Sequence, residues 1–245
     1  MKDPSAFDFD GDYGAAYDDL VQRVIPGYHD LFEATLALFR TRLERQAHVL
    51  IVGCGTGKEI ATFAPAEPEW RFTGVDPSRQ MLETAAGVVA RLGVEARVVL
   101  HHGYVDELPA PVRFEAATVI NVLHFLADDG AKEHLLRSVA ERVRPGGLVA
   151  VFDLHGSPSS PGFRQLMAGW SAFMERRGLT GAAKAQFLQR LDAGIVYVPE
   201  GRLMELCQSA GLTLLSRYFG GFLYGGWLFL REPGTTDDEA VAAAR

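Results

Sequence analysis

The sequence predicts a doubly wound α/β fold, in which helices cover both faces of one largely parallel sheet. Short apolar runs bounded by glycine recur between residues 48 and 153, as expected of strands that are buried on both faces. Segments of helical periodicity lie between these runs, notably residues 78–91 and 131–143. Because strands and helices alternate in this way, the strands should lie parallel in a single sheet.

The strands can be placed in order along the chain. Five are expected at residues 48–53, 71–76, 96–100, 115–120 and 147–153. Two more, at residues 213–219 and 227–232, flank a glycine-rich segment. This arrangement predicts an antiparallel pair that closes the sheet.

Two helices should precede the first strand. The first carries an apolar stripe from Tyr13 onward, and Pro26 opens the second. The two stripes consist of Tyr17, Leu20, Val21 and Val24, and of Leu31, Phe32, Thr35, Leu36 and Phe39. The first twelve residues are acidic and contain glycine, and we expect them to be mobile.

The alternation of strands and helices stops after Asp153. Residues 156–162 have the composition of a loop, and apolar residues from Phe163 to Met174 then recur at helical spacing. Further helices are expected at residues 181–193 and 199–209. The apolar stripe of this insert fits core packing, and it also fits a lid that touches a substrate.

Composition narrows the classes of protein to which the chain can belong. Hydrophobic residues make up 48% and charged residues 22%, which is typical of a soluble globular protein. No apolar stretch approaches the roughly 20 residues of a membrane span, and the acidic N-terminus does not resemble a secretory signal, so a cytoplasmic location is expected. A net charge of −7 disfavours a dedicated nucleic-acid binder. Cys54 and Cys207 are too few for a disulfide framework or a zinc cluster, and no metal site is expected.

The first predicted strand runs directly into the glycine-rich segment GCGTG at residues 53–57, here called the glycine loop. Glycine is required where the backbone turns sharply and a ligand lies against it. Asp76 ends the second strand, where a carboxylate can accept both ribose hydroxyls of an adenosine-containing ligand. A helix cap is the other interpretation of Asp76. Lys58 stands where the dinucleotide fingerprint has its third glycine, which disfavours a pyrophosphate-bearing cofactor.

These motifs resemble those of the class I S-adenosylmethionine (SAM)-dependent methyltransferases. VLIVGCGTG is similar to their first motif, GVDPSRQML to their ribose motif, FEAATVINVLHFL to their fourth-strand motif and RVRPGGLVAVFD to the turn into their fifth strand. The resemblance covers residues 45–155 and 200–232. It implies SAM as cofactor and a Rossmann-like sheet of seven strands with a reversed last strand. The cofactor-binding residues that it implies are Gly53, Cys54, Gly55, Gly57, Asp76, Pro77, Met81, Tyr104, Val105 and Asn121.

Two positions depart from the pattern of this family. Its members usually carry an acid two residues before the first glycine, close to the amino group of the cofactor, and this chain has Ile51 there. The acid after the third strand, which meets the adenine amine, is replaced by Tyr104. Asp106 could take that role, or Tyr104 could stack on the base. A non-catalytic cofactor-binding protein therefore stays open as an alternative.

The front of the chain resembles a narrower group. Residues 7–31, above all RVIPGY at 23–28, are similar to the leading segment of the carboxy-S-adenosylmethionine synthases of tRNA wobble-uridine modification. In that group the segment folds over the cofactor site, which implies that Tyr17, Tyr28 and His29 lie near the chemistry. Arg190 is the nearest candidate for the carboxylate-binding arginine of those enzymes.

A sulfonium donor is already activated, so methyl transfer depends mainly on positioning, and it needs a base only where the acceptor must lose a proton. Ligands of open α/β sheets lie at the carboxyl ends of the strands. His155 follows the fifth strand and is the first candidate base, although an ordinary loop histidine is an equal interpretation; His29 is the second. His124 is expected to pack at a helix start. Cys54 has no assignable base, and we do not expect it to act as a nucleophile.

We therefore expect a methyltransferase that acts on a small molecule, with Trp170, Phe173, Tyr224 and Arg190 at the substrate. The alternatives are a carboxy-SAM synthase-like enzyme and a non-catalytic cofactor-binding protein. No nucleic-acid or membrane partner is expected, and the oligomeric state is open, with a homodimer as one option. The expected parts are an N-terminal helical cap (1–44), a cofactor-binding α/β core (45–155), a helical insert over the substrate site (156–198), the C-terminal part of the core (199–232) and a tail (233–245).

Overall fold

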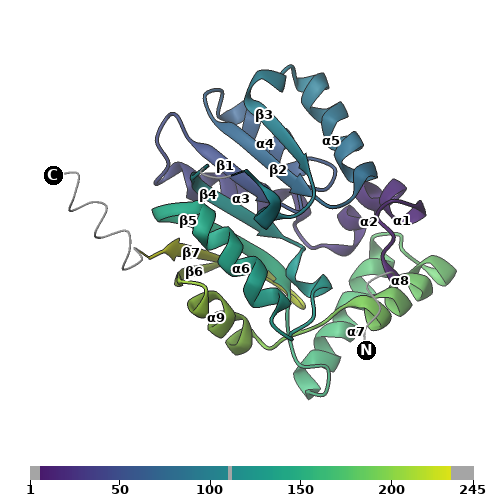
Figure 1. Cartoon of the computed structure of the whole chain (residues 1–245). Coiled ribbons are helices and arrows are strands. Elements are labelled where there is room, and N and C mark those ends of the chain that lie inside the picture. The colour runs from purple at the N-terminus through teal and green to yellow at the C-terminus, as the bar shows by residue number, and fades with distance from the viewer. Residues whose placement is uncertain (1–5, 110–111, 233–245) are drawn as a thin grey trace.

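In the computed structural model, which describes residues 6–109 and 112–232, seven strands form one sheet in the order β3-β2-β1-β4-β5-β7-β6 (Figure 1). Strands β1 to β5 pair in parallel, whereas β7 is antiparallel to both β5 and β6. The predicted doubly wound sheet with a reversed last strand is confirmed. The strands are β1 (His48–Val52), β2 (Arg71–Asp76), β3 (Val98–His102), β4 (Phe114–Ile120), β5 (Val143–Leu154), β6 (Leu212–Gly221) and β7 (Tyr224–Arg231).

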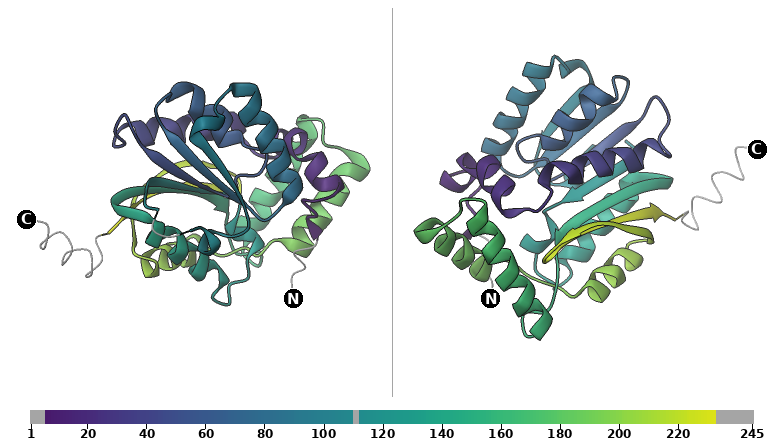
Figure 2. Two further views of the ribbon diagram at one scale, coloured as in Figure 1. Left: turned by 45° about the horizontal axis from the view of Figure 1, so that its top comes forward. Right: turned by 180° about the vertical axis from the view of Figure 1, so that it is seen from behind.

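Helices cover both faces of the sheet (Figure 2). One face is covered by α3 (Tyr28–Arg40), α4 (Lys58–Ala66) and α5 (Arg79–Leu92), and the other by α6 (Ala131–Arg142) and α9 (Glu200–Ser209). Along β1, Val49 and Ile51 join the first core, whereas Leu50 and Val52 join the second. Successive side chains of a strand point to opposite faces, so a strand covered on both faces reads as a continuous apolar run.

Four helices gather at one end of the sheet (Figure 1). They are α1 (Asp12–Ala15), α2 (Tyr17–Val24), α7 (Pro161–Arg176) and α8 (Gly181–Gly194). Three 3₁₀ turns, η2 (Glu95–Arg97), η3 (Val105–Glu107) and η4 (Leu123–Phe125), lie in the connections of the sheet. None of the described helices is long and apolar enough to cross a membrane.

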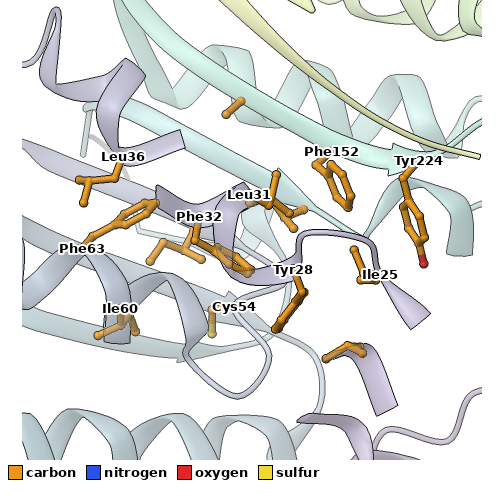
Figure 3. Packing of buried hydrophobic residues seen from close by; sticks show 14 of the residues in the cluster. Ile25, Tyr28, Leu31, Phe32, Leu36, Cys54, Ile60, Phe63, Phe152 and Tyr224 are labelled. Carbon is orange, nitrogen blue, oxygen red and sulfur yellow. The ribbon is translucent and has the colours of Figure 1, made fainter. Parts of the chain in front are cut away.

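Helix α3 packs across the glycine loop. Figure 3 shows Tyr28 and Phe32 of this helix beside Cys54 and Ile60. The helix begins two residues after Pro26, because Gly27 takes a left-handed φ of 64° and interrupts the expected start. Glycine adopts this conformation without the steric cost that other residues incur.

The first described residues are packed, so the prediction of a mobile first dozen is wrong for residues 6–12. Phe7 is buried, and its ring meets those of Tyr13 and Phe125 edge-on at centroid distances of 5.0 and 5.2 Å. Asp10 accepts hydrogen bonds from Ser78 Oγ at 2.8 Å and from Gln80 N at 3.0 Å. The aromatic residues of this segment pack against the fold although the segment is acidic in composition. Residues 1–5 and the predicted tail, 233–245, lie outside the described residues.

Trp170 attaches the insert to the N-terminal helices. Its ring is fully buried and packs edge-on against Phe187 and Tyr224, and its Nε1 donates a hydrogen bond to Val24 O at 2.6 Å. This position favours core packing among the two interpretations of the apolar stripe.

We expect Trp170→Ala to lower the free energy of unfolding by about 3–5 kcal/mol, because it leaves a cavity and an unpaired carbonyl. Urea denaturation followed by circular dichroism measures this change. Unchanged stability together with impaired turnover would instead place Trp170 at the substrate.

Candidate functional site

A cavity of about 520 Å³ opens at the carboxyl ends of β1, β2 and β4. Its walls come from the glycine loop, the ends of these strands, the segment after β3 and one side of α6. The chain leaves β1 toward β2 on one side, and β4 lies on the other, so the cavity lies where the strand order reverses. Open α/β sheets bind ligands at such a position, and the volume falls in the usual range of ligand sites, about 300–1,000 Å³.

The three glycines of the loop have different roles. Gly53, Gly55 and Gly57 take positive φ angles of 65°, 51° and 85°. A Cβ on Gly53 would lie 2.5 Å from Val122 Cγ2, and one on Gly57 would lie 3.3 Å from Ala85 of α5. A Cβ on Gly55 would meet no atom nearer than 3.9 Å, and Gly55 lines the cavity. Gly55 therefore leaves open space for a ligand, whereas Gly57 permits close packing between α4 and α5.

Asp76 ends β2 at the wall of the cavity and is 7% exposed. Its Oδ2 accepts a hydrogen bond from Gly55 N at 2.8 Å, and its Oδ1 accepts one from Ser78 N at 2.9 Å. Burial raises the pKa of this carboxyl group, and the two backbone bonds act against the rise. A carboxylate offers about four acceptor positions, so these bonds leave capacity for two ligand hydroxyls.

Asn121 follows β4 and lies at the junction of the main cavity and a smaller one. Its φ is +57°, and its backbone N donates to Phe152 O at 2.8 Å. Its Oδ1 is buried without a hydrogen-bond partner among the described residues. Backbone strain and an orphaned buried acceptor are both costly, and they are characteristic of functional positions.

The segment after β3 closes the far end of the main cavity. Tyr104 is 60% exposed and lines the cavity with Val105, which is buried. Tyr104 N donates to Glu107 Oε2 at 2.7 Å, and Asp106 Oδ2 lies 3.4 Å from His134 Nε2 of α6. This end therefore offers an aromatic face beside carboxylates.

The smaller cavity has a volume of about 30 Å³, enough for one or two water molecules. Phe7, Tyr17, Asn121 and Phe125 line both cavities, which places the two side by side. Its remaining walls are mostly apolar and come from α2, α8 and the ends of β5 and β7; they are Tyr13, Val21, Val24, Ile25, His124, Leu154, Phe187, Leu191, Ile195 and Tyr224.

His124 and Asp153 form a buried pair at the wall of the smaller cavity. The Nδ1 of His124 lies 2.5 Å from Asp153 Oδ1, and Asp153 also accepts the backbone N–H groups of Leu123 at 2.7 Å and Leu154 at 2.7 Å. Buried Lys132 donates to Leu123 O at 2.5 Å and so holds the same turn. Within residues 6–109 and 112–232, His124 Nε2 has no hydrogen-bond partner. When Nδ1–H donates to the carboxylate, Nε2 is left as the proton acceptor.

The two histidines that the sequence favoured as bases lie elsewhere. The ring of His155 meets Trp227 edge-on at 5.2 Å, and its Nε2 lies 3.4 Å from Arg217 Nη2. Burial and the nearby guanidinium lower the pKa of His155. His29 is exposed, with its Nε2 3.3 Å from Gln22 Oε1. Neither lines either cavity, and we propose no catalytic role for them.

Some of the other predicted site residues line a cavity, and others do not. The main cavity is lined by Gly53, Gly55, Asp76, Pro77, Met81, Tyr104, Val105, Asn121 and Tyr17, and the smaller one by Tyr224. Cys54, Gly57, Tyr28, Trp170, Phe173 and Arg190 line neither cavity. Burial raises the pKa of the Cys54 thiol, Phe173 packs against Phe222 at 5.6 Å, and the Arg190 guanidinium covers the Tyr13 ring at 5.2 Å.

Comparison with known proteins gives the site its context. A family model described as a methyltransferase domain matches residues 50–149. The 27-O-demethylrifamycin SV methyltransferase of Amycolatopsis mediterranei is 32% identical over 147 residues, which cover 56% of this chain and 53% of that protein. The chain thus spans about half the length of that relative. Carboxy-S-adenosyl-L-methionine synthase of Desulfotalea psychrophila is 21% identical over 232 residues and covers 92% of both chains.

The fold has counterparts among solved structures. The magnesium protoporphyrin IX methyltransferase of Synechocystis was solved with bound S-adenosylhomocysteine (SAH). It superposes with a TM-score of 0.67 at 12% identity, over 91% of this chain and 96% of that one. At this identity the likeness establishes the fold alone.

The residues of the main cavity fit an adenosyl cofactor. Asp76 retains acceptor capacity for ribose hydroxyls, Gly55 leaves space beside the backbone, and Asn121 Oδ1 lacks a donor that a ligand can supply. These three residues lie within the matched range, residues 50–149. Residues 50–149 of the chain match a methyltransferase domain, and the chain is similar to S-adenosylmethionine-dependent methyltransferases, with S-adenosylmethionine as its cofactor.

Proposed function

We propose that this chain transfers the methyl group of SAM to a hydroxyl group of a small molecule. The observation that carries the proposal is the buried pair of His124 and Asp153, which stands in the wall of an apolar cavity that shares four residues with the cofactor cavity. An oriented histidine beside the reacting centre is the group that a weakly acidic acceptor requires.

The cofactor supplies an electrophilic methyl group on a sulfonium centre. In our proposal Asp76 holds the ribose, and Tyr104 lies against the adenine with Asp106 near the adenine amine. Asn121 provides an acceptor at the boundary between cofactor and substrate. Phe7 and Phe9 from the N-terminal segment cover the cofactor and exclude water, since both line the main cavity.

His124 acts as the general base in this proposal. Its Nε2 would accept the hydroxyl proton as the acceptor oxygen forms its bond to the methyl group, the sulfur–methyl bond breaks and S-adenosylhomocysteine leaves. Asp153 fixes the tautomer through Nδ1 and stabilises the imidazolium that results. Lys132 keeps the turn in place through its bond to Leu123 O.

The acceptor must be small or must displace part of the wall. The smaller cavity has room for one or two water molecules, and its walls are mostly apolar and aromatic. Residues 6–25 and α8 form its outer side, so we propose that their movement admits the acceptor.

Two measurements test the proposal. SAM and SAH should each bind with saturation in calorimetry, and methyl-labelled SAM should transfer its label to small phenols or alcohols but not to their O-methylated analogues. Absence of binding by both cofactor forms at about 1 mM, the upper end of usual KM values, would remove the proposal.

A second candidate is an enzyme that carboxylates SAM, because the carboxy-SAM synthase relative matches over nearly the whole of both chains. Arg190, the nearest candidate for the carboxylate-binding arginine, lies over the Tyr13 ring and lines neither cavity. Mass spectrometry of the ligand retained through purification separates the two. A carboxylated sulfonium species supports the second candidate, and unmodified SAM or SAH supports the first.

A further inference from the structure

Glu59 is a buried carboxyl group for which the proposed mechanism has no use. It lies in the first turn of α4, directly after the glycine loop, and is 4% exposed. Among the described residues its side chain forms no ion pair, and the Thr118 hydroxyl and the backbone N–H of Glu59 itself lie near enough to lower its pKa by hydrogen bonding. Burial of an unpaired carboxylate is costly, so such a group needs a cation or must hold its proton.

Glu59 lies near Thr118, whose hydroxyl lowers its pKa, and the sheet register places Thr118 beside the position where the family carries an acid. Ile51 of β1 and Thr118 of β4 are direct neighbours in the parallel pairing. Ile51 packs in the core under α3 and α4, and the neighbours of Thr118 along β4 that face the same way, Ala116 and Ile120, belong to the same core. A carboxyl group near Thr118 therefore reaches the space that an acid at position 51 would enter from β1. In this chain the carboxyl group comes from helix α4, which packs on the sheet, and not from β1.

The surroundings of Glu59 are acidic or neutral rather than basic. Asp76 raises the pKa of Glu59, and Lys58 on its own helix lowers it. The groups that feel its charge from the packed elements are Tyr17 of α2, Tyr28 of α3, Cys54 of the glycine loop and Tyr218 of β6. Asp18 of α2 contacts the glycine loop, because its Oδ1 accepts a hydrogen bond from Thr56 Oγ1 at 2.6 Å.

This neighbourhood adjoins the cofactor cavity. Glu59 itself lines neither cavity, but Tyr17 and Asp76, which line the main one, lie near enough that Glu59 raises the pKa of Tyr17 and Asp76 raises the pKa of Glu59. A positively charged group of a ligand at this wall would therefore meet a carboxyl group that has no ion-pair partner, in a medium of low polarity.

We propose that Glu59 binds the α-ammonium group of SAM and so replaces the motif acid whose position Ile51 occupies. The inference rests on the proposed function in one respect, namely that SAM occupies the main cavity. It adds a residue from a helix where the family pattern places a residue from a strand.

Binding of an ammonium group beside Glu59 changes the protonation of its carboxyl group. Burial raises the pKa of Glu59 to about 8, so the carboxyl group holds its proton at pH 7 in the absence of a cation. An ammonium group beside it favours the ionised form and lowers that pKa. Binding of SAM at pH 7 therefore releases close to one proton from Glu59 to the buffer.

The test compares three ligands on wild-type protein and on Glu59→Gln by isothermal titration calorimetry. SAM and SAH both carry the α-ammonium group, whereas 5′-methylthioadenosine has the adenosyl group without it. The substitution should raise the Kd for SAM and SAH by on the order of 10- to 100-fold, as expected for a lost bond to a charged group. The Kd for 5′-methylthioadenosine should stay within about twofold of the wild-type value. Titrations in two buffers of different ionisation enthalpy should show proton release in the wild type and none in Glu59→Gln.

Glu83→Gln is the matched control, because Glu83 is an exposed residue of α5, outside both cavities. Equal affinity of Glu59→Gln and wild type for SAM, or proton uptake on binding, would overturn the inference. Failure of all three ligands to bind the wild type would instead overturn the proposed function. Retained binding of 5′-methylthioadenosine shows that the variant is folded.

Discussion

Replacing Asp76 with alanine should raise the Kd for SAM by at least about 100-fold. Two hydroxyl donors would each lose a bond to a charged acceptor, and such bonds contribute about 1.5–3 kcal/mol each. The substitution also frees Gly55 N and Ser78 N, which Asp76 holds at 2.8 and 2.9 Å. The glycine loop would then keep its backbone bonds from Gly53 N and Cys54 N to Val75 O but lose its bond to the side chain that ends β2. Isothermal titration with SAM and SAH measures the effect.

The control for this result is Asp106→Ala. Asp106 lies at the other end of the cavity, and its carboxylate makes one contact of 3.4 Å to an exposed histidine. Loss of this carboxylate should raise the Kd for SAM by about tenfold or less. Circular dichroism and thermal melting of each variant separate lost affinity from lost folding. An Asp76→Ala protein that is folded and binds SAM as tightly as wild type would contradict the ribose assignment.

Replacing His124 with glutamine should lower kcat for methyl transfer to a hydroxyl by about 10²–10⁴-fold, with the Kd for SAM within about threefold of wild type. This is the usual contribution of a positioned general base. Glutamine preserves a donor for Asp153 but cannot take up a proton at neutral pH. Single-turnover rates with labelled SAM, measured beside calorimetric affinities, separate the two effects.

His155→Gln provides the comparison. His155 lies against Trp227 and Arg217 and lines neither cavity, so its loss should change kcat by less than about threefold. If His155→Gln lowered kcat strongly and His124→Gln did not, the base would be the residue that the strand order favoured from sequence. A pH-rate profile that kept its acidic limb in His124→Gln would also contradict our assignment.

The sequence predicted the fold, and most of the residues that it assigned to the cofactor line the main cavity. Alternating apolar runs and helical segments determine the sheet, and the glycine loop followed by Asp76 depends on local backbone requirements that can be read along the chain. Helix α4 begins at Lys58, directly after this loop.

The acceptor half depends on which side chains meet across the sheet, and spacing does not encode this. His124 and Asp153 are 29 residues apart, and the pairing of Ile120 with Phe152 between β4 and β5 brings them together. The rule that ligands lie at the carboxyl ends of strands points to the edge of the sheet where both residues lie. It did not distinguish the buried pair from His155, one residue beyond β5.

Glu59 illustrates the same limit from another direction. A glutamate in the first turn of a helix ordinarily interacts with the helix dipole in solvent, and nothing in its spacing indicates burial. Its burial follows from the packing of α4 on β1 and β4, where Ile51 and Thr118 are neighbours. The acidic residues around Phe7 and Phe9 likewise led to the prediction of a mobile segment, although both phenylalanines line the main cavity.

A crystal structure of the protein with SAH tests the central claim most directly. We expect the ribose hydroxyls to lie within hydrogen-bond distance of the Asp76 carboxylate and the sulfur to point toward the wall formed by Asn121 and His124. An adenosyl group bound outside this cavity, or an Asp76 carboxylate that makes no contact with the ligand, would contradict it.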